Sequence, residues 1–259
     1  MLGVVIGDIA GSRFEFNNYR YTDFEIFAPD SDFTDDTVCA TAVVDWLLQG
    51  AQDNLIDIIR GWCANYPCPK GAYGGGFLRW LHSSNPQPYN SWGNGSAMRV
   101  SAVGWAFDDL NTTLEYACRS ASITHNHPEG IKGAQAVAAA VFWARNGHNK
   151  EQIREQTQQL FGYSLQQSCD DIRPYYQFSE SCQETVPQAI TAFLESNDFE
   201  HAVRLAVSLG GDSDTLAAIT GSIAEAFYGI PSTMREQALA VLPRHIAEVI
   251  LAFEARYGV

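Results

Sequence analysis

Basic residues are scarce in this sequence. It has 16 Lys and Arg residues against 30 Asp and Glu residues, which gives a formal net charge of −14. Binding to a nucleic-acid backbone depends on clustered Lys and Arg, so we do not expect a nucleic-acid-binding protein, and an anionic membrane surface would repel the chain. An anionic ligand would have to be held by a few local cations or by backbone N–H groups.

Paired cysteines and long apolar runs are also lacking. The six cysteines form no CxxC pair, and a chain of 259 residues does not need disulfides for its stability. The N-terminal segment MLGVVIGDIAGS has no basic region, and Asp8 interrupts its apolar run, so we expect no secretory signal. The longest apolar-rich stretch, residues 133–144, is too short to span a bilayer. These features predict a cytoplasmic protein with reduced thiols.

Charged residues make up 18% of the chain, below the usual share of about 25%, and apolar residues make up 46%. This composition favours a large buried core. No fixed repeat and no low-complexity linker divides the sequence, so we predict a single domain over residues 1–259.

Helical spacing of apolar residues recurs along the chain, whereas the alternation typical of strands is scarce. We therefore predict an all-α fold, a single compact domain of many helices. The predicted helices cover residues 37–48, 55–62, 95–107, 114–123, 129–144, 151–160, 186–195, 200–209, 215–228 and 245–256. Long loops at 67–76, 84–95 and 162–187 separate them, and such loops often carry function.

Two short acidic clusters stand at the starts of predicted helices. They are FTDDT at residues 33–37 and GGDSDT at residues 210–215. Helix capping explains one acidic residue at a helix start. Two close carboxylates raise each other's pKa unless a cation screens them, and hard divalent cations prefer oxygen ligands. Together the clusters would suit two metal ions, so capping and metal binding stand as equal alternatives. Zinc is not expected, because no HxxxH or Cys₂His₂ spacing occurs.

Six motifs, taken in their order, resemble those of the ADP-ribosylglycohydrolase family. They are GDIAGSRFE (7–15), FTDDT (33–37), GAYGGGF (71–77), GNGSAMRV (93–100), SITHNHPEG (122–130) and SLGGDSDT (208–215). The resemblance runs from residue 3 to about residue 231. Residues 181–229 are especially similar to the bacterial branch that includes the dinitrogenase-reductase-activating enzymes.

The resemblance implies an all-α fold with two Mg²⁺ or Mn²⁺ ions at the bottom of a cleft. It also implies hydrolysis of the bond between the anomeric carbon of ADP-ribose and an acceptor. The metal ligands that it implies are Thr34, Asp35, Asp36, Asp212, Asp214 and Thr215. The ions would hold the ribose 2′- and 3′-hydroxyls and polarise a water, through an oxocarbenium-like transition state. Glu15 or Asp36 would transfer the proton, while we expect Asp8 to cap a helix or support the ligands.

The same resemblance places the glycine-rich loops and a histidine over the ADP-ribose. Small residues let backbone N–H groups approach phosphate oxygens, and a neutral imidazole N–H can donate to phosphate. The substrate-binding residues predicted in this way are Gly74, Gly76, Asn94, Gly95, Ser96, Met98 and His125.

Other functions remain open at this point. The chain could be an ADP-ribose-binding module without turnover, a two-metal nucleotide phosphohydrolase or a purely structural helical protein. The expected partners are ADP-ribose and ADP-ribosylated substrates, bound by a monomer. The acceptor could be arginine, serine, a nucleobase or a small leaving group. Residues 161–187 could form an acceptor-side wall or simply cover the core.

Overall fold

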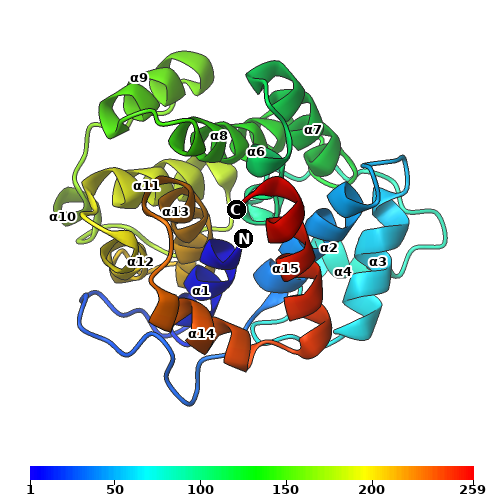
Figure 1. The fold of residues 1–259 in the computed structure, drawn as a ribbon, viewed down its shortest axis with the longest axis horizontal. Helices are drawn as coiled ribbons and strands as arrows, with labels where there is room; N and C mark the ends of the chain where they lie inside the picture. Colours follow the sequence, from blue (N-terminus) through cyan, green and yellow to red (C-terminus); the bar gives the residue numbers. More distant parts are fainter.

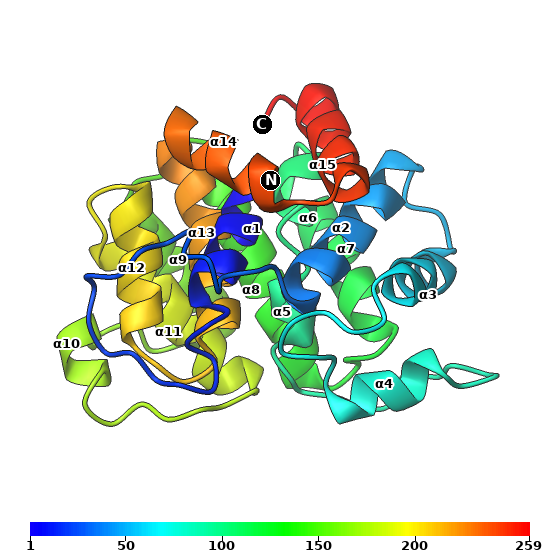
Figure 2. The same ribbon diagram turned by 90° about the horizontal axis from the view of Figure 1, so that it is seen from below.

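Helix α1 (Leu2–Gly11) runs through the interior of the protein, and all ten of its residues are buried. The computed structural model describes residues 1–259. Helix α1 packs along α13 (Ser213–Tyr228), most of which is also buried. Figures 1 and 2 show α10, α11 and α12 on one side of this pair and α2, α3 and α4 on the other.

The chain forms fifteen α-helices and no sheet, so the predicted all-α fold is confirmed. The remaining helices are α2 (Asp35–Leu48), α3 (Leu55–Asn65), α4 (Gly75–Leu81), α5 (Gly95–Met98), α6 (Val103–Ala106), α7 (Leu110–Ser122), α8 (Pro128–Arg145), α9 (Lys150–Phe161), α10 (Cys169–Ile172), α11 (Cys182–Glu195), α12 (Phe199–Ser208), α14 (Ser232–Val241) and α15 (Arg244–Tyr257). No helix combines the length and hydrophobicity that crossing a bilayer requires.

Glycines set the distance between α1 and α13. Gly3 and Gly7 are four residues apart, so they lie on one face of α1. A Cβ atom on Gly7 would lie 2.0 Å from the Ala217 carbonyl oxygen, and one on Gly3 would lie 2.3 Å from the Gly221 carbonyl oxygen. The two backbones are therefore in direct contact, which no larger side chain would permit.

Some helix predictions were wrong. Residues 95–107 form two short helices, α5 and α6, instead of one. The chain turns at Arg99, and the buried side chain of Arg99 donates hydrogen bonds to the Ser120 carbonyl and the Thr124 hydroxyl. The predicted loop 162–187 contains α10, and α11 begins at Cys182, with Pro187 inside it. Helices α1, α4 and α14 were not predicted. Helix α1 is apolar apart from Asp8, so it lacks the polar stripe that marks an amphipathic helix.

We predict that Gly7→Ala destabilises the protein by about 1–3 kcal/mol, because the added methyl overpacks the contact with α13. The matched control is Gly61→Ala on α3, where a Cβ meets nothing within 4 Å. There alanine should raise stability by up to about 1 kcal/mol through helix propensity. Urea unfolding measures both variants. Equal stability of the two would contradict the close contact.

Candidate active site

A polar cleft of about 200 Å³ opens at the starts of α2, α4, α5 and α13. Of its 21 lining residues, only five are hydrophobic, which is unusual for a ligand pocket. The lining residues that the sequence predicted are Glu15, Asp35, Asp36, Gly74, Gly76, Asn94, Gly95, Met98, His125, Asp212, Asp214 and Thr215. Those that it did not predict are Cys39, Ala72, Gly75, Phe77, Tyr89, Ser91, Gly93, Arg99 and Glu180. Thus, six motifs that lie far apart in the sequence meet at one place.

Five carboxylates form two overlapping triplets, and all of them except Asp8 line the cleft. Oxygen atoms of Asp8, Asp36 and Asp214 all lie within 4.8 Å of one another, and so do oxygen atoms of Glu15, Asp212 and Asp214. Asp214 belongs to both triplets. Because these residues come from α1, α2, α13 and the segments beside them, the packing of three helices assembles the cluster.

Asp8 connects α1 to the start of α2. Its Oδ2 atom accepts hydrogen bonds from the backbone N–H groups of Thr34, at 2.9 Å, and Thr37, at 3.1 Å. The Thr37 hydroxyl also donates to this atom. The expected capping role of Asp8 is therefore confirmed. Its Oδ1 atom is buried and has no partner, which leaves one oxygen free toward the acidic cluster.

Hydroxyl groups hold Asp36 in place. The Thr215 hydroxyl donates to Asp36 Oδ2 at 3.1 Å, and the Thr34 hydroxyl lies 3.4 Å from the same atom. Thr34 is the N-cap of α2 and accepts from the Asp36 backbone N–H at 3.2 Å. Thr34 is fully buried beneath the cleft, whereas Asp36 and Thr215 line it.

Asp212 is fixed by the turn before α13 and by Asn94. Gly210 and Gly211 both have left-handed φ angles, of +74° and +71°, which glycine adopts without strain. The Asn94 side-chain amide donates to Asp212 Oδ2 at 2.6 Å and to the Thr185 hydroxyl at 3.1 Å. Asn94 therefore uses both of its N–H groups to hold the cleft wall.

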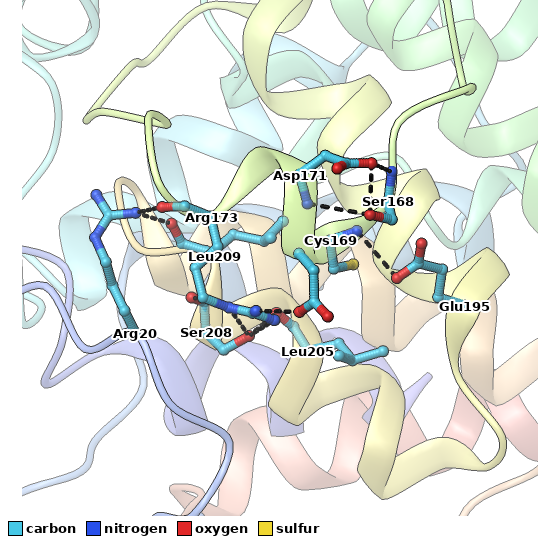
Figure 3. Close-up of polar contacts among 10 residues, drawn as sticks. Arg20, Ser168, Cys169, Asp171, Arg173, Glu195, Leu205, Ser208 and Leu209 are labelled. Carbon is cyan, nitrogen blue, oxygen red and sulfur yellow. Dashed lines mark hydrogen bonds and ion pairs between the residues drawn. The ribbon is translucent and has the colours of Figure 1, made fainter.

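Two arginines, Arg20 and Arg173, bind the end of α12, just before this turn (Figure 3). Arg20 donates to the backbone carbonyls of Leu209, at 3.0 Å, and Tyr176, at 2.6 Å, and also to that of Arg173. Arg173 in turn donates to the Ser208 carbonyl at 3.1 Å. The end of α12 is thus tied both to the segment after α1 and to the segment after α10.

The region 161–187 was expected either to wall the acceptor side or to cover the core. Arg173 and Asp171 make structural contacts, since Asp171 forms the capping box of α10 with Ser168. Figure 3 shows Asp171 bonded to Ser168, and Arg173 bonded to Ser208 at the end of α12. Phe178, by contrast, is exposed and stacks on the exposed Phe16, with ring centroids 6.0 Å apart.

Burial and mutual repulsion raise the pKa values of the clustered carboxyl groups. Burial raises the pKa of Asp8 to about 6. Burial and the charges of Asp212 and Asp8 raise the pKa of Glu15 to about 7. The pKa values of Asp36 and Asp214 are raised well above the usual range by the same two causes.

The cluster fits divalent cations. It offers oxygen ligands alone, which hard cations such as Mg²⁺ prefer, and its repulsion would be relieved by positive charge. Asp8 Oδ1 and Glu15 Oε2 are buried oxygens without a hydrogen-bond partner. Two triplets that share one carboxylate have the donor set of a dinuclear site.

Other residues that line the cleft offer hydrogen-bond donors and a positive charge, that of Arg99. Gly74 and Gly76 line it at the start of α4, Gly95 and Met98 lie on α5, and His125 follows α7. Ser96 does not line the cleft, because its hydroxyl points away and donates to the Gly130 carbonyl at 2.7 Å. Donor groups and carboxylates therefore line the same cleft, and their difference in charge can orient a bound molecule.

Comparisons with known proteins agree with this geometry. The family model described as ADP-ribosylglycohydrolase matches residues 1–257. The chain therefore belongs to the ADP-ribosylglycohydrolase family and is a hydrolase of that class, as the motifs predicted.

Individual relatives are distant in sequence but match over most of the chain. ADP-ribosylhydrolase ARH3 from Mus musculus is 28% identical, over 76% of this chain and 70% of its own length. ADP-ribosylarginine hydrolase Tri1 from Pseudomonas putida is 27% identical, over 89% and 70%. A solved structure, the ADP-ribosylglycohydrolase-related protein complex, superposes with a TM-score of 0.76 at 24% identity, covering 100% of this chain and 96% of that chain. This last likeness shows the shared fold.

Three residues shape the site in ways that the sequence did not predict. Asp8 was expected to cap a helix or support the ligands, yet one of its oxygens belongs to an acidic triplet. Arg99 lies inside the 93–100 motif, but the motif does not indicate that the Arg99 side chain is buried and lines the cleft. Arg20 belongs to no motif, and only its contacts with distant carbonyls reveal its role.

We predict that, in a chelating buffer, Glu15→Gln becomes more stable than the wild type as pH rises. The pKa of Glu15 is about 7 in the folded protein and near 4.5 in an unfolded chain. The folded state therefore binds more protons between these values, so ionised Glu15 destabilises it progressively up to about pH 7. Urea unfolding at pH 5 and pH 8 measures the difference. If the wild type instead becomes more stable relative to Glu15→Gln as the pH rises, the raised pKa of Glu15 is wrong.

Proposed function

We propose that this protein is a metal-dependent hydrolase that cleaves the bond between the anomeric carbon of ADP-ribose and an acceptor, releasing ADP-ribose. The observation that carries the proposal is the pair of carboxylate triplets sharing Asp214, at a cleft that is also lined by hydrogen-bond donors. We expect the protein to act as a monomer in the cytoplasm.

We propose that two Mg²⁺ or Mn²⁺ ions bind at the carboxylate cluster. The residues that would hold them are Thr34, Asp35, Asp36, Asp212, Asp214 and Thr215. When bound, such ions supply Lewis acidity and hold neighbouring oxygen atoms of a substrate in place. The Thr215 hydroxyl already contacts Asp36, and Asn94 already contacts Asp212, so these carboxylates are oriented by the protein itself.

Glu15 and Asp36 are the proposed proton-transfer groups. A carboxyl group whose pKa is about 7 can both donate and accept a proton at neutral pH, and Glu15 has this property. Asp36 lines the same cleft and is held by threonine hydroxyls. The surrounding carboxylates would also stabilise the positive charge that develops on the sugar ring during glycosidic cleavage.

We propose that charge sets the direction in which ADP-ribose binds. The carboxylates repel a pyrophosphate, so we place it beside Gly74, Gly76, Gly95 and His125, and we place the reacting ribose beside the carboxylates. Met98 lines the same cleft, while Asn94 and Ser96 shape its wall through their bonds to Asp212 and Gly130.

An ADP-ribosylated protein side chain such as arginine is the proposed substrate. The exposed Glu180 lines the same cleft as Glu15, so the cleft presents negative charge to an incoming guanidinium group. The Pseudomonas putida relative bears the name ADP-ribosylarginine hydrolase, and a Rhodospirillum rubrum relative bears the name ADP-ribosyl-[dinitrogen reductase] glycohydrolase. Both names fit this substrate class.

We predict release of ADP-ribose from ADP-ribosylarginine peptides in Mg²⁺ or Mn²⁺, and loss of the reaction in EDTA. Asp35→Ala with Asp36→Ala should abolish turnover, and Glu15→Gln should reduce kcat by about 10²–10⁴-fold, the usual share of a general acid or base. The control double variant is Glu151→Ala with Glu155→Ala, an exposed pair on α9, which should keep full activity.

The identity of the product separates the alternatives in the same assay. AMP in place of ADP-ribose would show a phosphohydrolase, and ADP-ribose binding without turnover of arginine-, serine- and nucleobase-linked substrates would show a binding module. Full activity after exhaustive chelation would contradict the metal requirement.

We predict that Asp214→Asn weakens Mn²⁺ binding more than Asp212→Asn does. Asp214 belongs to both triplets, so its charge would serve both ions, whereas Asp212 belongs to one. If Asp214 only capped α13, asparagine would be a nearly equal substitute. Calorimetric titration of Mn²⁺ into the two variants decides between these roles, and near-wild-type affinity in Asp214→Asn would show that the bridging role is wrong.

A further inference from the structure

Three buried polar side chains, two of which line the cleft, form a hydrogen-bonded series. Arg99 Nη2 lies 2.9 Å from the Thr124 hydroxyl, and this hydroxyl lies 2.7 Å from His125 Nδ1. Arg99 Nη2 also donates to the Ser120 carbonyl at 2.7 Å. Arg99 is 1% exposed and His125 is 5% exposed, so water does not compete for these bonds.

The direction of each hydrogen bond follows from the chemistry of its partners. A guanidinium group only donates, so the Thr124 oxygen accepts from Arg99. The Thr124 hydroxyl is fully buried, and its one other neighbour in hydrogen-bond range is His125 Nδ1. Its proton must therefore point at Nδ1, because a buried hydroxyl without an acceptor is costly. Nδ1 is then the acceptor and carries no proton.

A neutral imidazole with a bare Nδ1 carries its proton on Nε2. Burial and the nearby Arg99 charge lower the pKa of His125 well below its usual value, which favours this neutral form. His125 Nε2 makes no hydrogen bond to the protein, and its ring lines the cleft. The ring therefore presents an unused N–H donor to whatever the cleft binds.

Glycines leave the space beside this nitrogen open. A Cβ atom on Gly95 would lie 3.2 Å from His125 Nε2, and one on Gly93 would lie 3.5 Å from it. Arg99 lines the same cleft, its Nε atom has no partner, and its hydrogen bonds go only to Ser120 and Thr124. A buried positive charge without a carboxylate partner favours an anion beside it.

We propose that Arg99 and Thr124 are positioning residues, which fix His125 in its Nε2–H tautomer so that it donates to a phosphate oxygen of the bound pyrophosphate. This inference rests on the proposed function for the identity of the ligand. The tautomer matters because the other neutral form would present a lone pair to the phosphate and repel it. Without the hydrogen bonds from Arg99 to Thr124 and from Thr124 to Nδ1, the neutral His125 ring could adopt either tautomer.

The first test reads the tautomer directly. Two-bond ¹H–¹⁵N NMR spectra of the protein with ¹⁵N-labelled histidine distinguish a protonated ring nitrogen from a bare one. In the ligand-free wild type and in Thr124→Ser, which keeps the hydroxyl, we expect a bare Nδ1 and a protonated Nε2 in His125. In Thr124→Val, which keeps the shape but not the hydroxyl, we expect a mixture of tautomers. A protonated Nδ1 in the wild type would overturn the proposal.

The second test measures the consequence for binding. Calorimetric titration with ADP-ribose should give about tenfold weaker binding for Thr124→Val, the size expected for one hydrogen bond, and wild-type affinity for Thr124→Ser. In turnover, KM should rise for Thr124→Val while kcat stays close to the wild type. Unchanged affinity in Thr124→Val would refute the positioning role. Absence of ADP-ribose binding in the wild type, with the Nε2–H tautomer in place, would instead refute the proposed function.

Discussion

The close contact between α1 and α13 is the constraint on which the site depends. Because Gly7 leaves no side chain between the helices, the backbone of α1 lies against Ala217. The carboxylate of the next residue, Asp8, then lies close to that of Asp214 at the start of α13, and its Oδ2 atom accepts hydrogen bonds from the start of α2. A wider spacing of the two helices would separate these carboxylates.

The cost of this arrangement is electrostatic. Five carboxylates share a largely buried region with raised pKa values, and a protein without need of them would gain stability by replacing them. The surrounding structure holds them by hydrogen bonds from Thr37, Thr215 and Asn94 rather than by pairing them with basic side chains. Buried like charges held in this way are typical of a site that binds cations.

The local chemistry of the chain predicted a large part of this picture. Both acidic clusters were expected at helix starts, and α2 begins at Asp35 and α13 at Ser213, because caps and first-turn acids act on their immediate neighbours. The directions of side chains could not be predicted in the same way. Ser96 turns to Gly130, and Asn94 turns to Asp212, because partners from distant segments decide where they point.

Helix α1 marks another limit of sequence reasoning. Its residues are apolar apart from Asp8, so the pattern that identifies an amphipathic helix is missing, and its position at the centre of the fold shows only in three dimensions. Arg99 and Arg20 are similar cases, since a lone arginine in a sequence gives no sign of the carbonyls and hydroxyls that it will hold.

The central claim, that three helices assemble a site for two cations around Asp214, is tested most directly by anomalous diffraction from crystals grown with Mn²⁺. The account predicts two manganese peaks in the cleft, one beside Asp36 and one beside Asp212, with the Asp214 carboxylate contacting both. A cleft without manganese, or with ions that Asp214 does not contact, would contradict it.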